Sequence, residues 1–204
     1  MARPRLPEPI SPRGDMLRAA TRLLRRGGLA AAGVNRIVAE SGAPKGSLYH
    51  FFPDGKEQIA REALAAYAER VAARVRERLE PMMGDPAAVV RGFFAMGAEA
   101  ALRSDYALSC PAGAVALDLE PDDAELRRAC DGVFARLADE LVAVLAVLPA
   151  ARRAPFAGLM VSTMQGAYIR ARAARSLAPF DEAGEQLALL VPALRATTTQ
   201  GNRR

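Results

Sequence analysis

The chain has little of what catalytic and metal-binding sites are built from. Its 204 residues include one His, two Cys and no Trp, and only 5% are aromatic. A helical di-metal site needs Glu-x-x-His pairs, and the single histidine, His50, has no such partner. No Walker loop, dinucleotide-binding fingerprint or Gly-x-Ser-x-Gly elbow occurs. The sequence therefore predicts neither an enzyme nor a metal or cofactor site.

Long apolar runs are also missing. The longest, around LVAVLAVLPA, is far shorter than the roughly 20 residues that a membrane-spanning helix needs. The N-terminal segment has no apolar stretch of the kind found in signal peptides. Cys110 and Cys130 lack the spacing of metal ligands or of a disulfide framework, which is typical of a reducing compartment. We therefore expect a cytoplasmic protein with no membrane partner.

Lysine is almost absent, and the positive charge is unevenly distributed. Only two of the 28 basic residues are lysines, Lys45 and Lys56. Residues 1–56 carry ten Lys/Arg against four Asp/Glu, whereas residues 57–204 carry 18 against 19. All of the excess positive charge thus lies in the first quarter of the chain. This asymmetry predicts a surface for a polyanion, although a merely solvated basic face would have the same composition.

Strand signals are missing as well. No segment alternates apolar and polar residues, whereas apolar residues recur every three or four positions through most of the chain. Three short helices are expected within residues 13–52, after a Pro-rich arm. Breaks at Pro and Gly then separate about six longer helices, expected over residues 55–80, 86–104, 111–119, 122–148, 151–176 and 181–198. The prediction is an all-α fold of about nine helices.

The three short helices have the plan of a helix-turn-helix DNA-binding unit. In PKGSLYHFF the apolar residues form one side of the third helix and the polar residues the other. Gly46 lacks a side chain, so the backbone can approach a DNA groove closely. Lys45, Gly46 and Ser47 are expected nearest base edges, and Tyr49 and His50 at phosphates.

Lys56 is unusual because of its position at the start of the fourth helix. Asp54 and Glu57 have the spacing of a capping box, which would place Lys56 in the first helical turn. A cation there is unfavourable against the helix dipole, but a DNA phosphate bound at the helix N-terminus would make it favourable. We predict a phosphate contact for Lys56; an ordinary surface lysine is the alternative.

The segment from Gly27 to Leu64 resembles the DNA-binding region of TetR/AcrR-family transcriptional regulators. The resemblance rests on the turn SGAPKG, the LYHFF core and the Lys-Glu pair that opens the fourth helix. Three segments, FPDGKE, CPAGAVALDLE and GAYIRARAARSLAPF, resemble the LmrA/YxaF branch of the family. The family commonly opens the second helix with Thr or Ser, whereas this chain has Ala32-Gly33.

The resemblance implies two domains: an N-terminal arm and helix-turn-helix domain over residues 1–54, and a helical effector-binding and dimerisation domain over residues 55–204. It adds Asn35 and Arg36, on the second helix, to the expected DNA contacts. It also implies a homodimer formed through the last two helices. Such a dimer would bind a palindromic operator in double-stranded DNA.

The C-terminal helices carry the residues expected to bind a small-molecule effector. Met and aromatic side chains suit a permissive apolar pocket, although each could simply pack the core. Gln165 and Tyr168 place hydrogen-bonding groups on an otherwise apolar helix, and Cys110 precedes Pro111 near a helix N-terminus, where a thiolate would be stabilised. The full candidate set is Phe93, Met96, Cys110, Phe134, Met164, Gln165 and Tyr168.

These features together predict a ligand-responsive transcriptional regulator, most commonly a repressor in the family that it resembles. Its effector is expected to be a small apolar or amphipathic compound. The alternative is a DNA-binding regulator without a small-molecule ligand, controlled by redox chemistry or by another protein.

Overall fold

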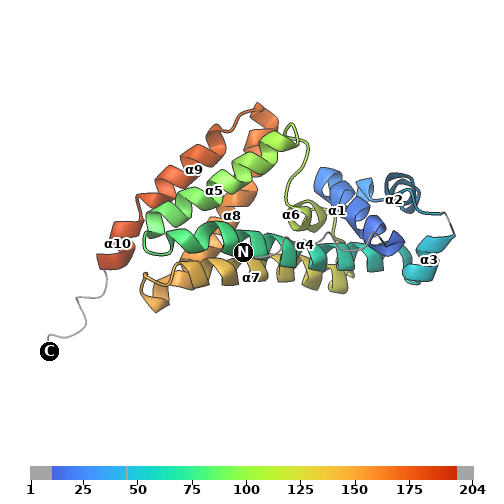
Figure 1. Cartoon of the computed structure of the whole chain (residues 1–204), viewed down its shortest axis with the longest axis horizontal. Coiled ribbons are helices and arrows are strands. Elements are labelled where there is room, and N and C mark those ends of the chain that lie inside the picture. The colour runs from blue at the N-terminus through green and yellow to red at the C-terminus, as the bar shows by residue number, and fades with distance from the viewer. Residues whose placement is uncertain (1–10, 45, 197–204) are drawn as a thin grey trace, which may run out of the picture.

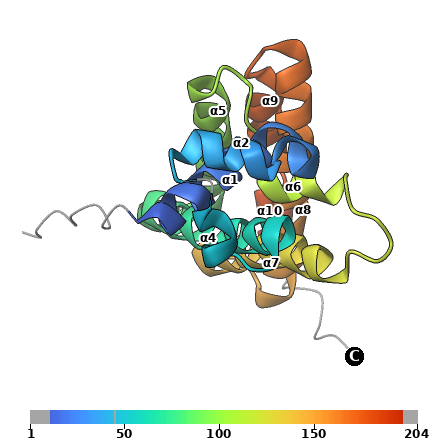
Figure 2. The same cartoon turned by 90° about the vertical axis from the view of Figure 1, so that its right-hand side faces the viewer.

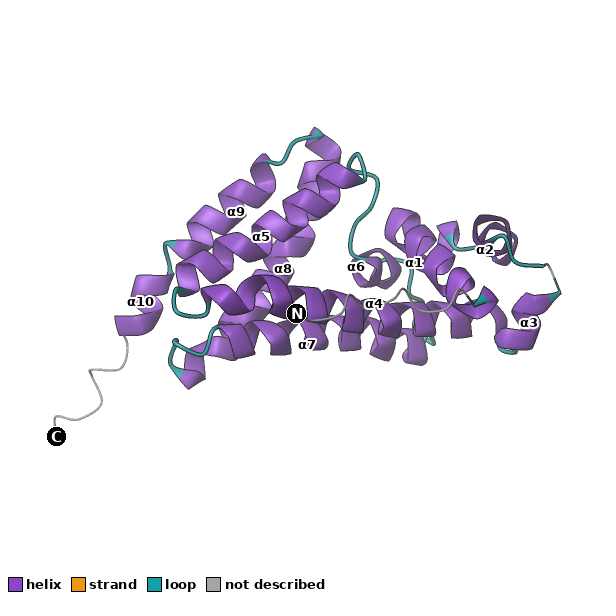
Figure 3. Ribbon diagram, viewed as in Figure 1, coloured by secondary structure: helices purple, strands orange, loops and turns teal. Residues whose placement is uncertain are grey.

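The computed structural model describes residues 11–44 and 46–196. Within those ranges the chain forms ten α-helices and one short 3-10 helix and contains no strand (Figure 3). The predicted all-α fold is therefore confirmed. The first three helices are α1 (Pro12–Ala31), α2 (Val34–Ser41) and α3 (Ser47–Phe51). The others are α4 (Gly55–Leu79), η1 (Glu80–Met82), α5 (Pro86–Arg103), α6 (Pro111–Ala116), α7 (Ala124–Val144), α8 (Ala150–Ala174), α9 (Ala178–Ala188) and α10 (Val191–Ala196).

Helix α4 is the central helix of the molecule and takes part in both of its hydrophobic cores. It runs side by side with α7, while α1, α2 and α3 gather at one end and α5, α8 and α9 at the other (Figure 1). The first half of α4 belongs to a core that includes Leu48 and Phe52, and its second half to a core that includes Phe94 and Phe180. The first core continues into α6 and α7, so α4, α6 and α7 connect the two ends of the molecule. The predicted boundary between residues 54 and 55 stays a prediction.

Helix α1 is bent where the sequence predicts its end. Ser11 caps its start by accepting a hydrogen bond from the Gly14 N–H at 3.1 Å. The backbone leaves the helical conformation at Gly27 and at Gly28, which has φ +61°, and one further turn follows up to Ala31. A side chain at Gly28 would meet the Asp118 Oδ2 atom at 2.2 Å. Glycine is therefore required there both by its conformation and by space.

The predicted last helix is divided into α9 and α10. Helix α9 ends at Ala188, and α10 begins at Val191 with Pro192 as its second residue. A proline ring clashes with the carbonyl group four residues earlier and removes one backbone donor. The carbonyl concerned belongs to Ala188, which explains why the helix breaks at this point.

No helix in residues 11–44 and 46–196 has both the length and the hydropathy needed to cross a bilayer.

Candidate DNA-binding surface and effector pocket

The turn between α2 and α3 lies at one end of the molecule (Figure 2). Helix α2 ends at Gly42, which adopts the left-handed conformation with φ +68° that glycine favours. Leu48 and Phe52 are fully buried in the core beneath α3. These two anchors hold α3 on the core, and they leave its opposite side in solvent.

Most of the predicted DNA contacts lie exposed at this end. Tyr49 is 61% exposed, Asn35, Arg36, Gly46 and His50 are also exposed, and Ser47 and Lys56 are half-buried. The Ser47 hydroxyl donates to the Pro44 carbonyl at 2.6 Å, and the His50 ring packs against Phe51. In the part of the chain that the structure describes, the side chains of Asn35, Arg36, Tyr49 and Lys56 have no hydrogen bond or ion pair. Lys45 lies outside the described residues.

The start of α4 differs from the predicted capping box. Asp54 precedes α4 but its side chain makes no capping hydrogen bond. Instead, the Asp54 N–H donates to the Gln58 side chain at 3.1 Å, and the Asp54 carboxylate lies 3.7 Å from Arg61. The predicted capping box of Asp54 and Glu57 is therefore wrong, because the side chain of Gln58, and not that of Glu57, accepts from the Asp54 N–H. Lys56 still lies in the first turn of α4, as predicted.

The start of α2 also lacks a capping side chain. Gly33 precedes the helix and forms no side-chain cap, which follows directly from the replacement of a hydroxyl residue by glycine. The N–H groups of the first turn of α2 therefore have no side-chain acceptor from the residue before the helix.

A pocket of about 540 Å³ lies between α1, α4, α5 and α8. Six of the seven predicted effector residues line it: Phe93, Met96, Cys110, Met164, Gln165 and Tyr168. Phe134 is not in the lining; it is half-buried and packs against both cores. The Gln165 side chain lies against Gly113 of α6, where an added Cβ would meet its Oε1 atom at 2.7 Å. Residues from α5 and α8, with Cys110 just before α6, thus converge on one cavity.

Sequence reasoning missed the other wall of this pocket. Helix α1 contributes Thr21 and three arginines, and α4 contributes Tyr67 and two arginines. The signal was present, because residues spaced by three and four positions share one face of a helix, as Arg18, Arg22 and Arg25 do. Composition alone predicts that the positive charge of the first quarter of the chain forms a surface for a polyanion or a solvated face, whereas the structure places these three arginines of α1 at the pocket.

The tyrosine hydroxyls of the pocket remain protonated. Burial raises the pKa of Tyr168 to about 12, and burial also raises the pKa of Tyr67 well above its ordinary value, with a smaller contribution from Cys110. Neither hydroxyl has a hydrogen bond within the described ranges. Both can therefore donate to a bound molecule.

Cys110 is a small buried residue, which is the interpretation that its sequence context favours over a reactive thiol. It precedes α6 and is buried, and burial raises its pKa, opposed by weaker hydrogen bonds from the backbone N–H groups of Gly113 and Ala112. Burial likewise raises the pKa of Cys130 to about 11. The thiolate, which is the reactive form, is disfavoured at both positions.

Two short helices joined by a turn, with Leu48 and Phe52 buried beneath the second helix and its polar side exposed, are typical of a helix-turn-helix DNA-binding protein. Comparisons with known proteins agree with this class. The profile of bacterial regulatory proteins of the tetR family matches residues 16–63, and that of the LmrA/YxaF-like regulator C-terminal domain matches residues 86–186. The chain belongs to the TetR family of transcriptional regulators; it is a DNA-binding regulator and not an enzyme.

Similar proteins cover most of the chain. An uncharacterised helix-turn-helix regulator of Mycobacterium tuberculosis H37Rv is 31% identical over 86% of this chain and 92% of its own length. YxaF of Bacillus subtilis is 36% identical over 61% of this chain and 67% of its own length. The crystal structure of a TetR regulatory protein from Rhodobacter sphaeroides superposes with a TM-score of 0.76 at 23% identity, covering 86% of this chain and 96% of that chain.

Proposed function

We propose that the protein is a cytoplasmic, homodimeric repressor that binds a palindromic operator and is released from it by a small molecule. The observation that carries this proposal is the pocket, because α1 forms one wall of it and also packs against α2 and α3. A molecule bound in the pocket would therefore touch a helix that supports the DNA-binding surface. The proposed DNA contacts are Asn35, Arg36, Lys45, Gly46, Ser47, Tyr49, His50 and Lys56.

Three hydrogen-bonded contacts support coupling between the pocket and the DNA-binding end. The Ser109 N–H donates to the Arg25 carbonyl and the Arg25 Nε–H donates to the Ser109 carbonyl, each at 2.9 Å. Arg172 of α8 donates to the Arg26 carbonyl at 3.1 Å, and Asp118 accepts from the Leu29 N–H at 2.7 Å. A ligand that favours one position of α1 shifts the spacing of two recognition helices in a dimer, provided that its affinities for the two positions differ.

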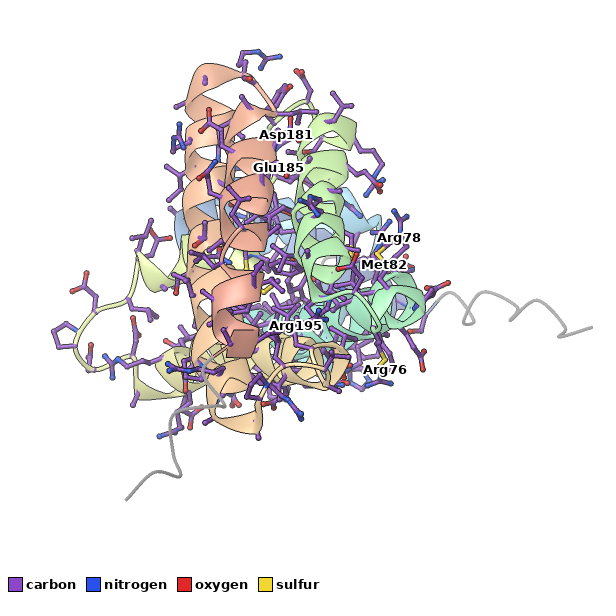
Figure 4. The ribbon with its side chains drawn as sticks, turned by 90° about the vertical axis from the view of Figure 1, so that its left-hand side faces the viewer. Arg76, Arg78, Met82, Asp181, Glu185 and Arg195 are labelled. Atoms are coloured by element: carbon purple, nitrogen blue, oxygen red, sulfur yellow. The ribbon has the colours of Figure 1, made fainter. Side chains whose placement is uncertain are left out.

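The last helices support a homodimer. Helix α8 packs its buried face on α7 and α9, yet Leu159 is 45% exposed and Ile169 63% exposed on its other face. Ser162 and Gly166, which are small and exposed, lie between them on the same face, and small residues let two helices approach closely. Leu189, between α9 and α10, is 65% exposed. Figure 4 views the molecule from the end where α9 and α10 carry Asp181, Glu185 and Arg195.

The test is operator binding by fluorescence anisotropy, with duplexes from the protein's own promoter region and scrambled duplexes as the control, at low and high salt. We expect tight binding that prefers the native sequence and weakens linearly on a log–log plot against salt. Equal binding to native and scrambled duplexes by a folded dimer would contradict the proposal for that promoter. If molecules that bind in the pocket leave operator affinity unchanged, the proposed release by a small molecule is contradicted.

A further inference from the structure

Most arginines of the pocket lining come from two helices, α1 and α4. On α1, Arg18, Arg22 and Arg25 are spaced by four and three residues, so they lie along one helix face. On α4, Arg70 and Arg74 are spaced by four residues, and a sixth arginine, Arg103, comes from the end of α5. No Asp or Glu is among the residues that line the cavity. The lining therefore carries a formal charge of six positive units and no negative one.

Three of these arginines have a carboxylate partner outside the lining. Arg22 lies 3.6 Å from Glu40, Arg103 lies 3.3 Å from Glu99, and Arg18 pairs with Asp15. These three acidic residues neutralise part of the positive charge. None of them lines the pocket, so the lining itself still contains no anionic side chain.

The other three have no carboxylate within ion-pair distance in the described part of the chain. Arg25 donates to the Ser109 carbonyl and lies 5.8 Å from the centre of the Tyr67 ring. Arg70 has a single hydrogen bond of 3.4 Å, to the Thr21 hydroxyl, and Arg74 has none. Partial burial lowers the pKa of Arg70; Tyr67 opposes this shift, and the charges of Arg18 and Arg25 add to it. The site thus holds like charges together without a compensating anion.

The hydroxyl groups near these arginines are donors too. The phenols of Tyr67 and Tyr168 stay protonated, as described above. By contrast, the inner lining is apolar and adaptable, because it is formed by Phe93, Met96 and Met164 together with Leu137. A cavity of about 540 Å³ is within the range of small-molecule sites. The lining thus combines side chains that suit an anionic group with side chains that suit an apolar body.

We propose that the effector is an amphipathic organic anion, whose carboxylate or phosphate group lies between the arginines of α1 and α4 and whose apolar part lies among Phe93, Met96 and Met164. Arginine binds either anion through paired, charge-assisted hydrogen bonds. Such an anion bridges α1 to α4 and so pulls the helix that supports the DNA-binding surface toward the effector-binding helices. This proposal deepens the effector response proposed above and rests on it.

The experiment compares four probes that share one apolar chain and differ only in head group: decanoate, decyl phosphate, decanol and decyltrimethylammonium. Isothermal titration calorimetry on the full-length protein without DNA, below the micelle concentration of each probe, gives the affinities. We expect decanoate or decyl phosphate to bind roughly tenfold or more tightly than decanol, with the preference shrinking at high salt, and no binding of the cation. The stronger of the two anions identifies the head group as carboxylate or phosphate.

Variants locate the binding site. In R70Q/R74Q the preference for the anion over decanol should fall roughly tenfold, whereas decanol binding should hold. This ratio is insensitive to a loss of folded protein, which reduces both affinities equally. Arg128→Gln on the exposed face of α7 is the matched control, because Arg128 lies outside the pocket. An unchanged ratio in R70Q/R74Q, or decanol binding as tightly as both anions, overturns the proposal.

Operator binding, measured separately, distinguishes this failure from failure of the proposed function. If the anions bind in the pocket without releasing operator DNA, the ligand class stands and the effector response fails. If neither anion is preferred over decanol but operator binding is specific, the proposal of an anionic effector is wrong and the proposal of an operator-binding regulator stands.

Discussion

Asp118 caps a turn of helix 89 positions away in the sequence. Its Oδ2 atom accepts a hydrogen bond from the Leu29 N–H at 2.7 Å and lies 3.4 Å from the Ala30 nitrogen. The carboxylate reaches this turn only because α1 bends at Gly28. Asp118 lies just after α6, and the pocket-lining Cys110 lies just before it, so this contact joins the helix beside the pocket to the last turn of α1.

Gly28→Ala should destabilise the protein by about 1–3 kcal/mol or more, since the residue has a positive φ and its Cβ would lie 2.8 Å from the Ala114 carbonyl oxygen. The measurement is urea unfolding followed by circular dichroism. Gly132→Ala is the matched control, because Gly132 lies within α7 with open space around it. That variant should be stabilised by roughly 0.5–1 kcal/mol. Equal stability of the Gly28 variant and the wild type would contradict the structural role of the bend.

The sequence predicts this part of the fold well because glycine and proline mark it. Breaks at Gly27-Gly28 and Gly42, and the prolines in the first turn of α5, α6 and α9, coincide with residues whose backbone preferences are local. The capping box is wrong because Gln58, and not Glu57, accepts from the Asp54 N–H, and geometry rather than spacing decides between these two side chains.

The pocket could be predicted only in part, for a different reason. Met and aromatic residues on α5 and α8 indicate one wall. The other wall depends on α1 turning its arginine face toward α4, which is a property of tertiary packing and not of local pattern. Phe134 shows the opposite error: it is an aromatic residue of α7 that local pattern assigns to the pocket, but it packs against the two cores and does not line the cavity.

Operator binding should depend on Tyr49 and Lys56. Tyr49→Phe removes the exposed phenol, and Lys56→Ala removes a half-buried cation that has no ion pair in the described ranges. Each should weaken binding to all duplexes, and Lys56→Ala should reduce the slope of log affinity against log salt by about one per half-site. Arg152→Ala, at an exposed position in the first turn of α8, serves as the charge-matched control in the anisotropy titration. Normal operator affinity in both variants would contradict the prediction that Tyr49 and Lys56 contact DNA.

The inducer response should depend on Gln165 and Tyr168, which line the pocket from α8. Gln165→Ala and Tyr168→Phe each remove a group that can hydrogen-bond a ligand. We expect a several-fold rise in the decanoate or decyl phosphate concentration that releases DNA, with operator affinity nearly unchanged, because the DNA-binding surface is untouched. An unchanged release concentration in both variants would exclude the two side chains from the effector site.

Stability in acid should depend on Glu140, which is 5% exposed and is held by two arginines. The Arg76 guanidinium, hydrogen-bonded at 3.0 Å, lowers the pKa of this carboxyl; burial opposes the shift, and Arg136 adds to it. A lowered folded-state pKa adds stability that is present above the ordinary value of 4.5 and is lost as the pH falls through the folded value.

Glu140→Gln should therefore cost about 1–2 kcal/mol near neutral pH, a range reduced by the solvent exposure of both arginines. The difference from the wild type should shrink in acid and stay constant from about pH 6 to 8. Thermal unfolding at a series of pH values measures it. Glu77→Gln is the control, because Glu77 is exposed on the same α4 helix and has no ion pair in the part of the chain described. A difference that persists unchanged below the ordinary pKa would contradict this assignment.

Dimerisation should depend on the exposed apolar face of α8. Ile169→Asp places a charge on a side chain that is 63% exposed in the single chain and that would be buried between two copies, where an unpaired charge costs several kcal/mol. We expect a monomer by light scattering after size exclusion, with helical content retained and operator binding lost, because two recognition helices must bind together. Leu117→Asp is the matched control, since Leu117 is 83% exposed beside α6 and away from the last two helices. If Ile169→Asp remains dimeric while Leu117→Asp dissociates, the dimer forms through another face.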